Sequence, residues 1–113
     1  MTHISPTFSV SPQITAADIA AIKAAGYRAI ICNRPDNEGA DQPAFAEIAA
    51  AARAADLKTA YIPVIPGAVT QDNVTALAAA LKDLPQPVLA YCRSGARAAS
   101  LWSLCDGKQP TAV

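Results

Sequence analysis

The feature that most constrains this chain is a regular alternation between short β-type runs and longer helical patterns. Four runs predict strands, at residues 7–10, 28–32, 58–64 and 88–91. Four patterns predict helices, at residues 16–25, 43–55, 70–82 and 96–104. Alternation of this kind favours parallel strands that are joined by right-handed crossovers and covered by helices. We therefore expect a three-layer α/β/α fold around a short, mainly parallel four-stranded sheet.

The length and charge of the chain limit the classes of function that it could have. A chain of 113 residues forms a single domain, 1–113, that can bury a core without disulfides or metals. Lys and Arg number 9, as do Asp and Glu, so the formal net charge of +0 gives no attraction for nucleic acid or anionic membranes. No run approaches the roughly 20 apolar residues of a membrane span, and residues 1–6 lack the regions of a signal peptide. We expect a cytoplasmic protein without a metal, cofactor, nucleic-acid or membrane partner.

Three predicted loops follow predicted strands and should meet at one edge of the sheet. They are residues 33–36, residues 65–67 and the segment that begins at Cys92. The carboxyl ends of parallel strands share an edge, and α/β sheets bind their ligands there. This edge is therefore the expected place of a functional site.

The segment from Cys92 to Arg97 is the strongest functional candidate. A cysteine nucleophile reacts as the thiolate, and the N-terminus of a helix favours that form. Gly95 lets successive backbone N–H groups turn inward as an anion-binding nest, and Arg97 supplies a forked cation. We predict Cys92 and Arg97 as catalytic residues. The neighbouring substrate-binding positions are Arg93, Ser94, Gly95 and Ala96.

Several of these residues also have a plainer explanation. Cys92 could be an inert buried cysteine before an ordinary turn, although two arginines and a glycine in that turn favour function. Arg93 could select an anionic donor or be a solvated surface charge. Arg34 could lie near the anion and Asp36 could brace the Cys92 loop, or the two could form a structural pair that closes a turn.

The other two cysteines are weaker candidates for a functional role. Cys32 ends the second predicted strand. If that strand neighbours the fourth, Cys32 could lie near Cys92 as a resolving thiol, although a buried core position is the more common role. Cys105 is about 20 Å from Cys92 along a helix, too far to pair with it in one chain.

The string from Tyr91 to Arg97 resembles the active loop of rhodanese-type sulfurtransferases. The chain as a whole resembles the phosphatase-like domains of beta-lactamase hydrolase-like proteins, through residues 8–15, 26–28, 33–36 and the Cys92 loop. This resemblance implies a fold like that of dual-specificity tyrosine phosphatases. Such domains also occur fused to persulfide dioxygenase-type metallohydrolases, which makes a persulfide dioxygenase a candidate partner.

The resemblance leaves sulfur transfer and phosphate hydrolysis open. A tyrosine-phosphatase loop has five residues between Cys and Arg, preceded by His and followed by Ser or Thr. Here four residues separate Cys92 from Arg97, Tyr91 precedes the loop and Ala98 follows it. Residues 65–69 contain no carboxylate that could act as general acid. The remaining candidate acids are Asp36 and Asp72, and Asp72 would equally suit the first turn of a helix.

These departures favour a sulfurtransferase. We expect Cys92 to take a sulfane sulfur from thiosulfate or a low-molecular-weight persulfide and to carry it as a persulfide. A thiol, sulfite or cyanide acceptor would then remove it, which is covalent ping-pong catalysis. A cysteine-dependent phosphatase of the dual-specificity type is the alternative, and a non-catalytic persulfide carrier or sensor is a further one.

Overall fold

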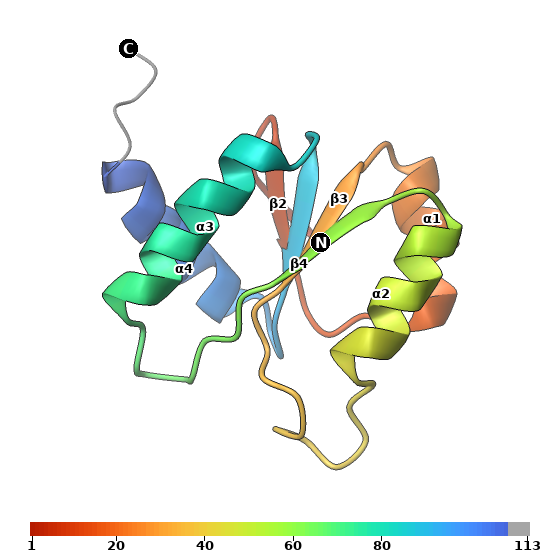
Figure 1. The fold of residues 1–113 in the computed structure, drawn as a ribbon, viewed down its shortest axis with the longest axis horizontal. Coiled ribbons are helices and arrows are strands. Elements are labelled where there is room, and N and C mark those ends of the chain that lie inside the picture. Colours follow the sequence, from red (N-terminus) through yellow and green to blue (C-terminus); the bar gives the residue numbers. More distant parts are fainter. Residues whose placement is uncertain (109–113) are drawn as a thin grey trace.

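A computed structural model describes residues 1–108 as a five-stranded sheet between two pairs of helices (Figure 1). The strands are β1 (Thr2–Ser5), β2 (Phe8–Ser11), β3 (Ala29–Cys32), β4 (Lys58–Tyr61) and β5 (Val88–Tyr91). The helices are α1 (Ile19–Ala24), which follows the 3-10 turn η1 (Ala16–Asp18), α2 (Phe45–Ala54), α3 (Gln71–Asp83) and α4 (Ala96–Lys108). The predicted α/β fold is therefore confirmed.

The sheet has the order β1-β2-β5-β3-β4. Strands β2, β5, β3 and β4 run parallel to one another, and β1 is antiparallel to β2. The prediction of four strands is wrong because β1 was missed. This strand lies at the edge, pairs with β2 alone and buries none of its side chains fully, so it needs no apolar pattern that a sequence could reveal.

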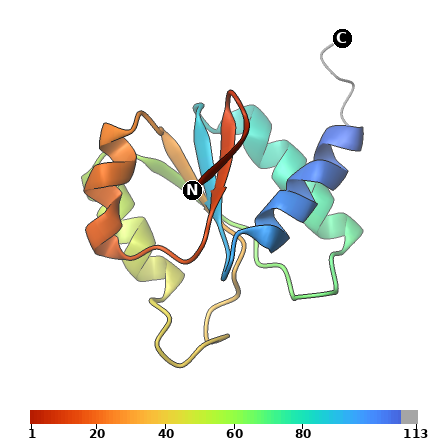
Figure 2. The same ribbon diagram turned by 180° about the vertical axis from the view of Figure 1, so that it is seen from behind.

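The two faces of the sheet carry different helices, as the two opposite views show (Figures 1 and 2). Helices α3 and α4 cover one face, where Ile31, Ala90 and Cys92 belong to the buried cluster. Helices α1 and α2 cover the other, where Cys32 and Tyr91 are buried. Successive residues of a strand point to opposite faces, so the central strands β3 and β5 are apolar on both.

Element boundaries differ from the predicted ones by a few residues. The strand predicted at 58–64 ends at Tyr61, yet its backbone continues to pair with the end of β3. The N–H of Ile62 donates to the carbonyl of Cys32 at 2.9 Å, and that of Val64 donates to the carbonyl of Asn33 at 3.0 Å. Pro63, which has no N–H, stands between them. The loop after β4 is thereby held against β3.

Candidate active site

The carboxyl ends of the four parallel strands meet at one edge of the sheet, the lower edge in Figure 1. The backbone N–H of Cys92 donates to the carbonyl of Ser11, and that of Gln13 donates to the carbonyl of Arg93, each at 3.3 Å. The N–H of Asn33 donates to the carbonyl of Tyr91 at 2.8 Å. The structure thus gathers the predicted loops and adds a fourth, after β2, that contains Gln13.

Cys92 lies where β5 ends and is 1% exposed. The N–H of Gly95 donates to Cys92 Sγ at 3.1 Å. Such a donor stabilises a charged sulfur more than a neutral one. The curl of the loop depends on Gly95, because its φ is +96° and an added Cβ would lie 3.4 Å from the backbone of Ser11.

The other residues of the loop lie at the surface around this buried sulfur. Arg93, Ser94 and Ala96 are exposed. The hydroxyl oxygen of Ser94 accepts a hydrogen bond from the N–H of Ala96 at 3.3 Å, so it serves the start of α4. Together with Arg97, Ser94 and Ala96 line one wall of a cavity of about 400 Å³. Its remaining lining residues are Pro66, Gly67, Val69 and Ser100.

Arg97 lies in the first turn of α4 and is tied to a residue that was not predicted from the sequence, Glu38. Its Nη1 donates to Glu38 Oε2 at 2.9 Å and its Nη2 donates to Glu38 Oε1 at 3.0 Å. Nη1 also donates to the carbonyl of Val64 at 2.9 Å. The hydrogen bond from Arg97 is the main cause that holds the pKa of Glu38 below its usual range. Glu38 is therefore ionised at neutral pH.

Arg34 reaches the same carboxylate from the other side. Its Nε donates to Glu38 Oε1 at 2.9 Å, and its Nη1 donates to Gln13 Oε1 at 3.1 Å. The side chain is largely buried and fills the space beside Gly39, where an added Cβ would lie 2.7 Å from Arg34 Nη2. Arg34 and Arg97 are thus brought together through Glu38.

Asp36 has a different place from the one predicted. Its Oδ1 accepts a hydrogen bond from the N–H of Phe45 at 2.8 Å, at the start of α2. Its own N–H donates to the hydroxyl of Tyr61 at 3.0 Å. Asp36 therefore braces the loop after β3 rather than the Cys92 loop, and the partner of Arg34 is Glu38 rather than Asp36. Arg34 and Glu38 lie in a loop, where a spacing of four residues does not imply contact, so the sequence gives no clear signal for this pair.

Cys32 lies beside β5 as expected but on the wrong face for a resolving thiol. It is in register with Tyr91 and belongs with Tyr91 to the cluster under α1 and α2, whereas Cys92 faces α3 and α4. Cys32 Sγ donates to the carbonyl of Arg34 at 3.2 Å, and burial raises the pKa of the Cys32 thiol. These observations favour a structural role for Cys32.

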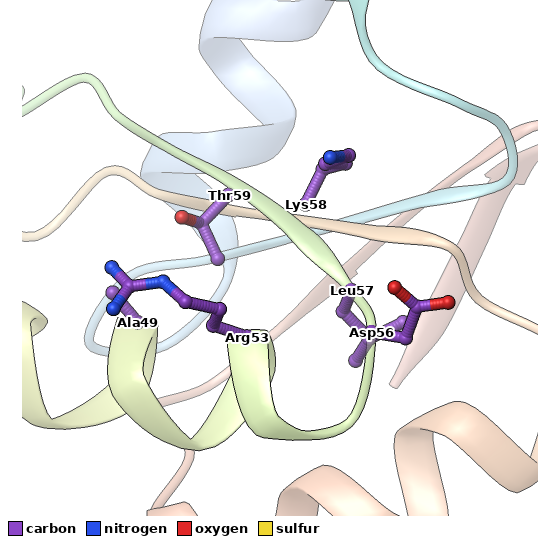
Figure 3. Close-up of a pocket in the computed structure, with 6 residues that line it drawn as sticks. All are labelled: Ala49, Arg53, Asp56, Leu57, Lys58 and Thr59. Atoms are coloured by element: carbon purple, nitrogen blue, oxygen red, sulfur yellow. The ribbon is translucent and has the colours of Figure 1, made fainter.

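A second hollow, of about 340 Å³, lies where α2 leads into β4, at the opposite end of that strand from the carboxyl edge. Arg53 extends toward Thr59 there, and Asp56 and Lys58 also line the hollow (Figure 3). In residues 1–108 no group of three or more His, Cys, Asp or Glu could hold a metal ion. Over the same residues, no helix has the length and apolar character needed to cross a membrane.

Proteins that resemble this chain match most of its length. The family described as the phosphatase-like domain of beta-lactamase hydrolase-like protein matches residues 1–109. A beta-lactamase hydrolase-like protein from Agrobacterium fabrum is 32% identical over 102 residues, which are 90% of this chain and 24% of that protein. One from Xylella fastidiosa is 40% identical over 81 residues, or 72% of this chain and 19% of that protein. The chain thus spans less than a quarter of the length of these curated relatives.

Two solved structures have the same fold as this chain. A crystal structure of a "putative phosphatase" from Neisseria meningitidis superposes with a TM-score of 0.85 at 33% identity, covering 96% of this chain and 79% of that one. Another protein so described, from Shewanella putrefaciens, gives a TM-score of 0.82 over 97% of this chain and 74% of its own, and at 23% identity it supports the fold alone. The chain has a phosphatase-like fold and belongs to the family of phosphatase-like domains of beta-lactamase hydrolase-like proteins.

Proposed function

We propose that this domain is a thiol-dependent sulfurtransferase in which Cys92 carries the sulfur. The observation that carries the proposal is the Cys92 loop itself, in which the N–H of Gly95 donates to Cys92 Sγ at 3.1 Å. The loop closes on Arg97 after only four intervening residues. It stabilises a small charged sulfur group without the wider ring that a phosphoryl group needs.

The proposed reaction has two steps, both without proton transfer. The Cys92 thiolate attacks the outer sulfur of thiosulfate, the sulfur–sulfur bond breaks, and its electron pair leaves on sulfite. A thiolate, sulfite or cyanide acceptor then attacks the terminal sulfur of the Cys92 persulfide, and the Cys92 thiolate leaves. A low-molecular-weight persulfide can replace thiosulfate in the first step, with a thiolate as the leaving group.

The carboxylates near the site support a reaction of this kind. Hydrolysis of a phosphate ester needs a general acid to protonate the leaving oxygen. Arg97 holds the pKa of Glu38 below its usual range, which keeps Glu38 ionised and unsuited to that task. The carboxylate of Asp36 accepts the N–H of Phe45, and Asp72 is exposed in the first turn of α3. Sulfite and thiolates leave without such an acid.

A cysteine-dependent phosphatase is the second candidate, and the comparisons favour it. The family is phosphatase-like, and the Neisseria neighbour at 33% identity is described as a "putative phosphatase". In this reaction Cys92 would attack phosphorus and form a phosphocysteine that water hydrolyses. Ala98 supplies no hydroxyl to assist that second step.

One pair of assays separates the two candidates. Wild type and Cys92→Ser are given thiosulfate with cyanide, and thiocyanate is measured over many turnovers; both are also given an aryl phosphate. Sulfur transfer predicts thiocyanate from the wild type alone and little phosphate release. Phosphate release that depends on Cys92, with no thiocyanate, would reverse the assignment. A single turnover that then stops would favour a persulfide carrier or sensor.

The proposal extends to a partner. The curated relatives are more than four times the length of the matched segment, so other regions accompany this domain in them. We propose that a persulfide dioxygenase exchanges sulfur with Cys92. Faster consumption of a persulfide by such an enzyme when the wild-type domain is added, but not Cys92→Ser, is the expected result.

A further inference from the structure

Glu38 links the two arginines of the site and is the centre of a chain of hydrogen bonds. The chain runs from Gln13 through Arg34 and Glu38 to Arg97, and it ends on the carbonyl of Val64. Its members come from the loops after β2, β3 and β4 and from helix α4. Every loop of the carboxyl edge therefore contributes to the placement of Arg97.

The hydrogen bonds of Arg97 leave one edge of its guanidinium group unused. The group has five N–H donors in one plane. Both donors on Nη1 are taken, by Glu38 Oε2 and the carbonyl of Val64, and one on Nη2 is taken by Glu38 Oε1. Within the described residues, Nε–H and the second Nη2–H have no hydrogen-bond partner, and these two form an edge that suits an oxyanion.

The unused edge belongs to a side chain that lines the cavity beside the Cys92 loop. Arg97 shares that cavity with Ser94 and Ala96. The rest of the Arg97 guanidinium group is held in place by Glu38. Glu38 is itself held by Arg34, which is 9% exposed and packs against Gly39. An arginine fixed in this way loses little freedom when it binds an anion.

We propose that Glu38 is a positioning residue that turns the Nε–Nη2 edge of Arg97 toward the sulfonate end of an inorganic sulfur donor. The proposal rests on the sulfur transfer proposed above, since it assigns Arg97 to the part of thiosulfate that leaves as sulfite. A competing role, in which Glu38 occupies the place of the substrate anion, predicts the opposite effect on binding. The free edge of Arg97 argues for positioning.

The first test measures anion binding without turnover. The affinity for thiosulfate is determined by calorimetry at low ionic strength for Cys92→Ser alone and combined with Glu38→Gln. Positioning predicts about tenfold weaker binding in the double variant. Glu47→Gln in the same background is the matched control, because Glu47 is the other glutamate of the chain and lies exposed on α2. Equal or tighter binding with Glu38→Gln would overturn the proposal.

The second test compares two donors in the active protein. With thiosulfate, Glu38→Gln should raise KM about tenfold and change kcat little, because Arg97 holds the sulfonate before and during the reaction. With glutathione persulfide, which has no sulfonate on the reacting sulfur, the variant should match the wild type. An equal loss with both donors would mean that Glu38 only supports the fold, and would overturn the proposal.

The two proposals can fail separately. If the wild type transfers sulfur from neither donor, the sulfurtransferase assignment fails, while calorimetry still decides the role of Glu38. If Glu38→Gln does not melt cooperatively, Glu38→Asp replaces it. That variant keeps the charge but is too short to hold both Arg34 and Arg97, and weaker binding of thiosulfate is again expected.

Discussion

Cys92 and Cys32 sit at the ends of neighbouring parallel strands and are almost equally buried, at 1% and 2% exposed. They nevertheless face opposite layers of helices. Cys92 Sγ accepts the N–H of Gly95, whereas Cys32 Sγ donates its proton to the carbonyl of Arg34. The second contact requires a thiol, and burial raises the pKa of Cys32.

Burial at the end of a strand is common to both cysteines, so burial does not distinguish them. What distinguishes Cys92 is the turn that follows it, where a glycine with positive φ leads directly into α4. The chain after Cys32 instead enters a long loop before α2. We therefore propose that the backbone around the sulfur, rather than burial, sets the reactivity of Cys92.

The largest expected difference lies in activity. Cys92→Ser should lower the rate of thiocyanate formation about a thousandfold or more, because no other group replaces the nucleophile. Cys32→Ser should keep the rate within about threefold of the wild type, since Cys32 faces the other layer. Steady-state assays of both variants check this. A large loss of activity in Cys32→Ser, with a normal melting curve, would contradict the separation of the two faces.

A glycine pair tests the turn itself. Gly95 and Gly26 have similar φ values, +96° and +100°, but an added Cβ meets the backbone of Ser11 only at Gly95. Both alanine variants should lose about 1–2 kcal/mol of unfolding free energy from backbone strain. Only Gly95→Ala should also slow sulfur transfer, by about 10- to 100-fold.

Urea denaturation and thiocyanate formation measure the two effects. Equal activities for Gly95→Ala and Gly26→Ala would show that the curl of the Cys92 loop is not needed for the reaction.

Alkylation tests the charge state of Cys32. Burial raises the pKa of this thiol above its ordinary value of 9.0, so little thiolate forms at pH 8. In Cys92→Ser, iodoacetamide should therefore label Cys32 more slowly than it labels Cys92 in Cys32→Ser. Peptide mass spectrometry over pH 7–9 gives both rates. Faster labelling of Cys32 would reverse the ranking of the two sulfurs.

The smallest effect concerns stability at high pH. Since the folded state raises the pKa of Cys32, its contribution is fully present below the pKa of the unfolded chain and is lost as pH rises through the folded pKa. Wild type should thus lose up to about 1 kcal/mol more than Cys32→Ser between pH 8 and pH 10. Burial, the main cause of the raised pKa of Tyr91, acts in both proteins, whereas the interaction with Cys32, the second cause, is altered in Cys32→Ser. Urea denaturation at both pH values measures this difference. An equal loss of unfolding free energy in wild type and Cys32→Ser would contradict this assignment.

The parts of the molecule that were predicted correctly depend on local patterns. Strand β5 and the start of α4 follow from an apolar run that ends at Cys92 and from the small residues after it. The contact between Glu38 and Arg97 joins residues 59 positions apart, so no local periodicity reveals it. The face of Cys32 depends on its register with Tyr91, which a single sequence does not contain.

The edge strand β1 and the role of Asp36 were missed for related reasons. Strand β1 is short and mostly exposed, so hydrophobic patterning does not mark it. Asp36 pairs with a backbone N–H at the start of α2, and backbone partners leave no trace in the types of neighbouring residues.

The intact mass of the protein after treatment with glutathione persulfide tests the central claim most directly. Wild type and Cys32→Ser should each gain about 32 Da, the mass of one sulfur, and fragmentation should place it on Cys92. Cys92→Ser should gain nothing. A protein that stays at its original mass in the presence of intact donor, or that carries the sulfur on Cys32, would contradict the assignment of Cys92 as the sulfur carrier.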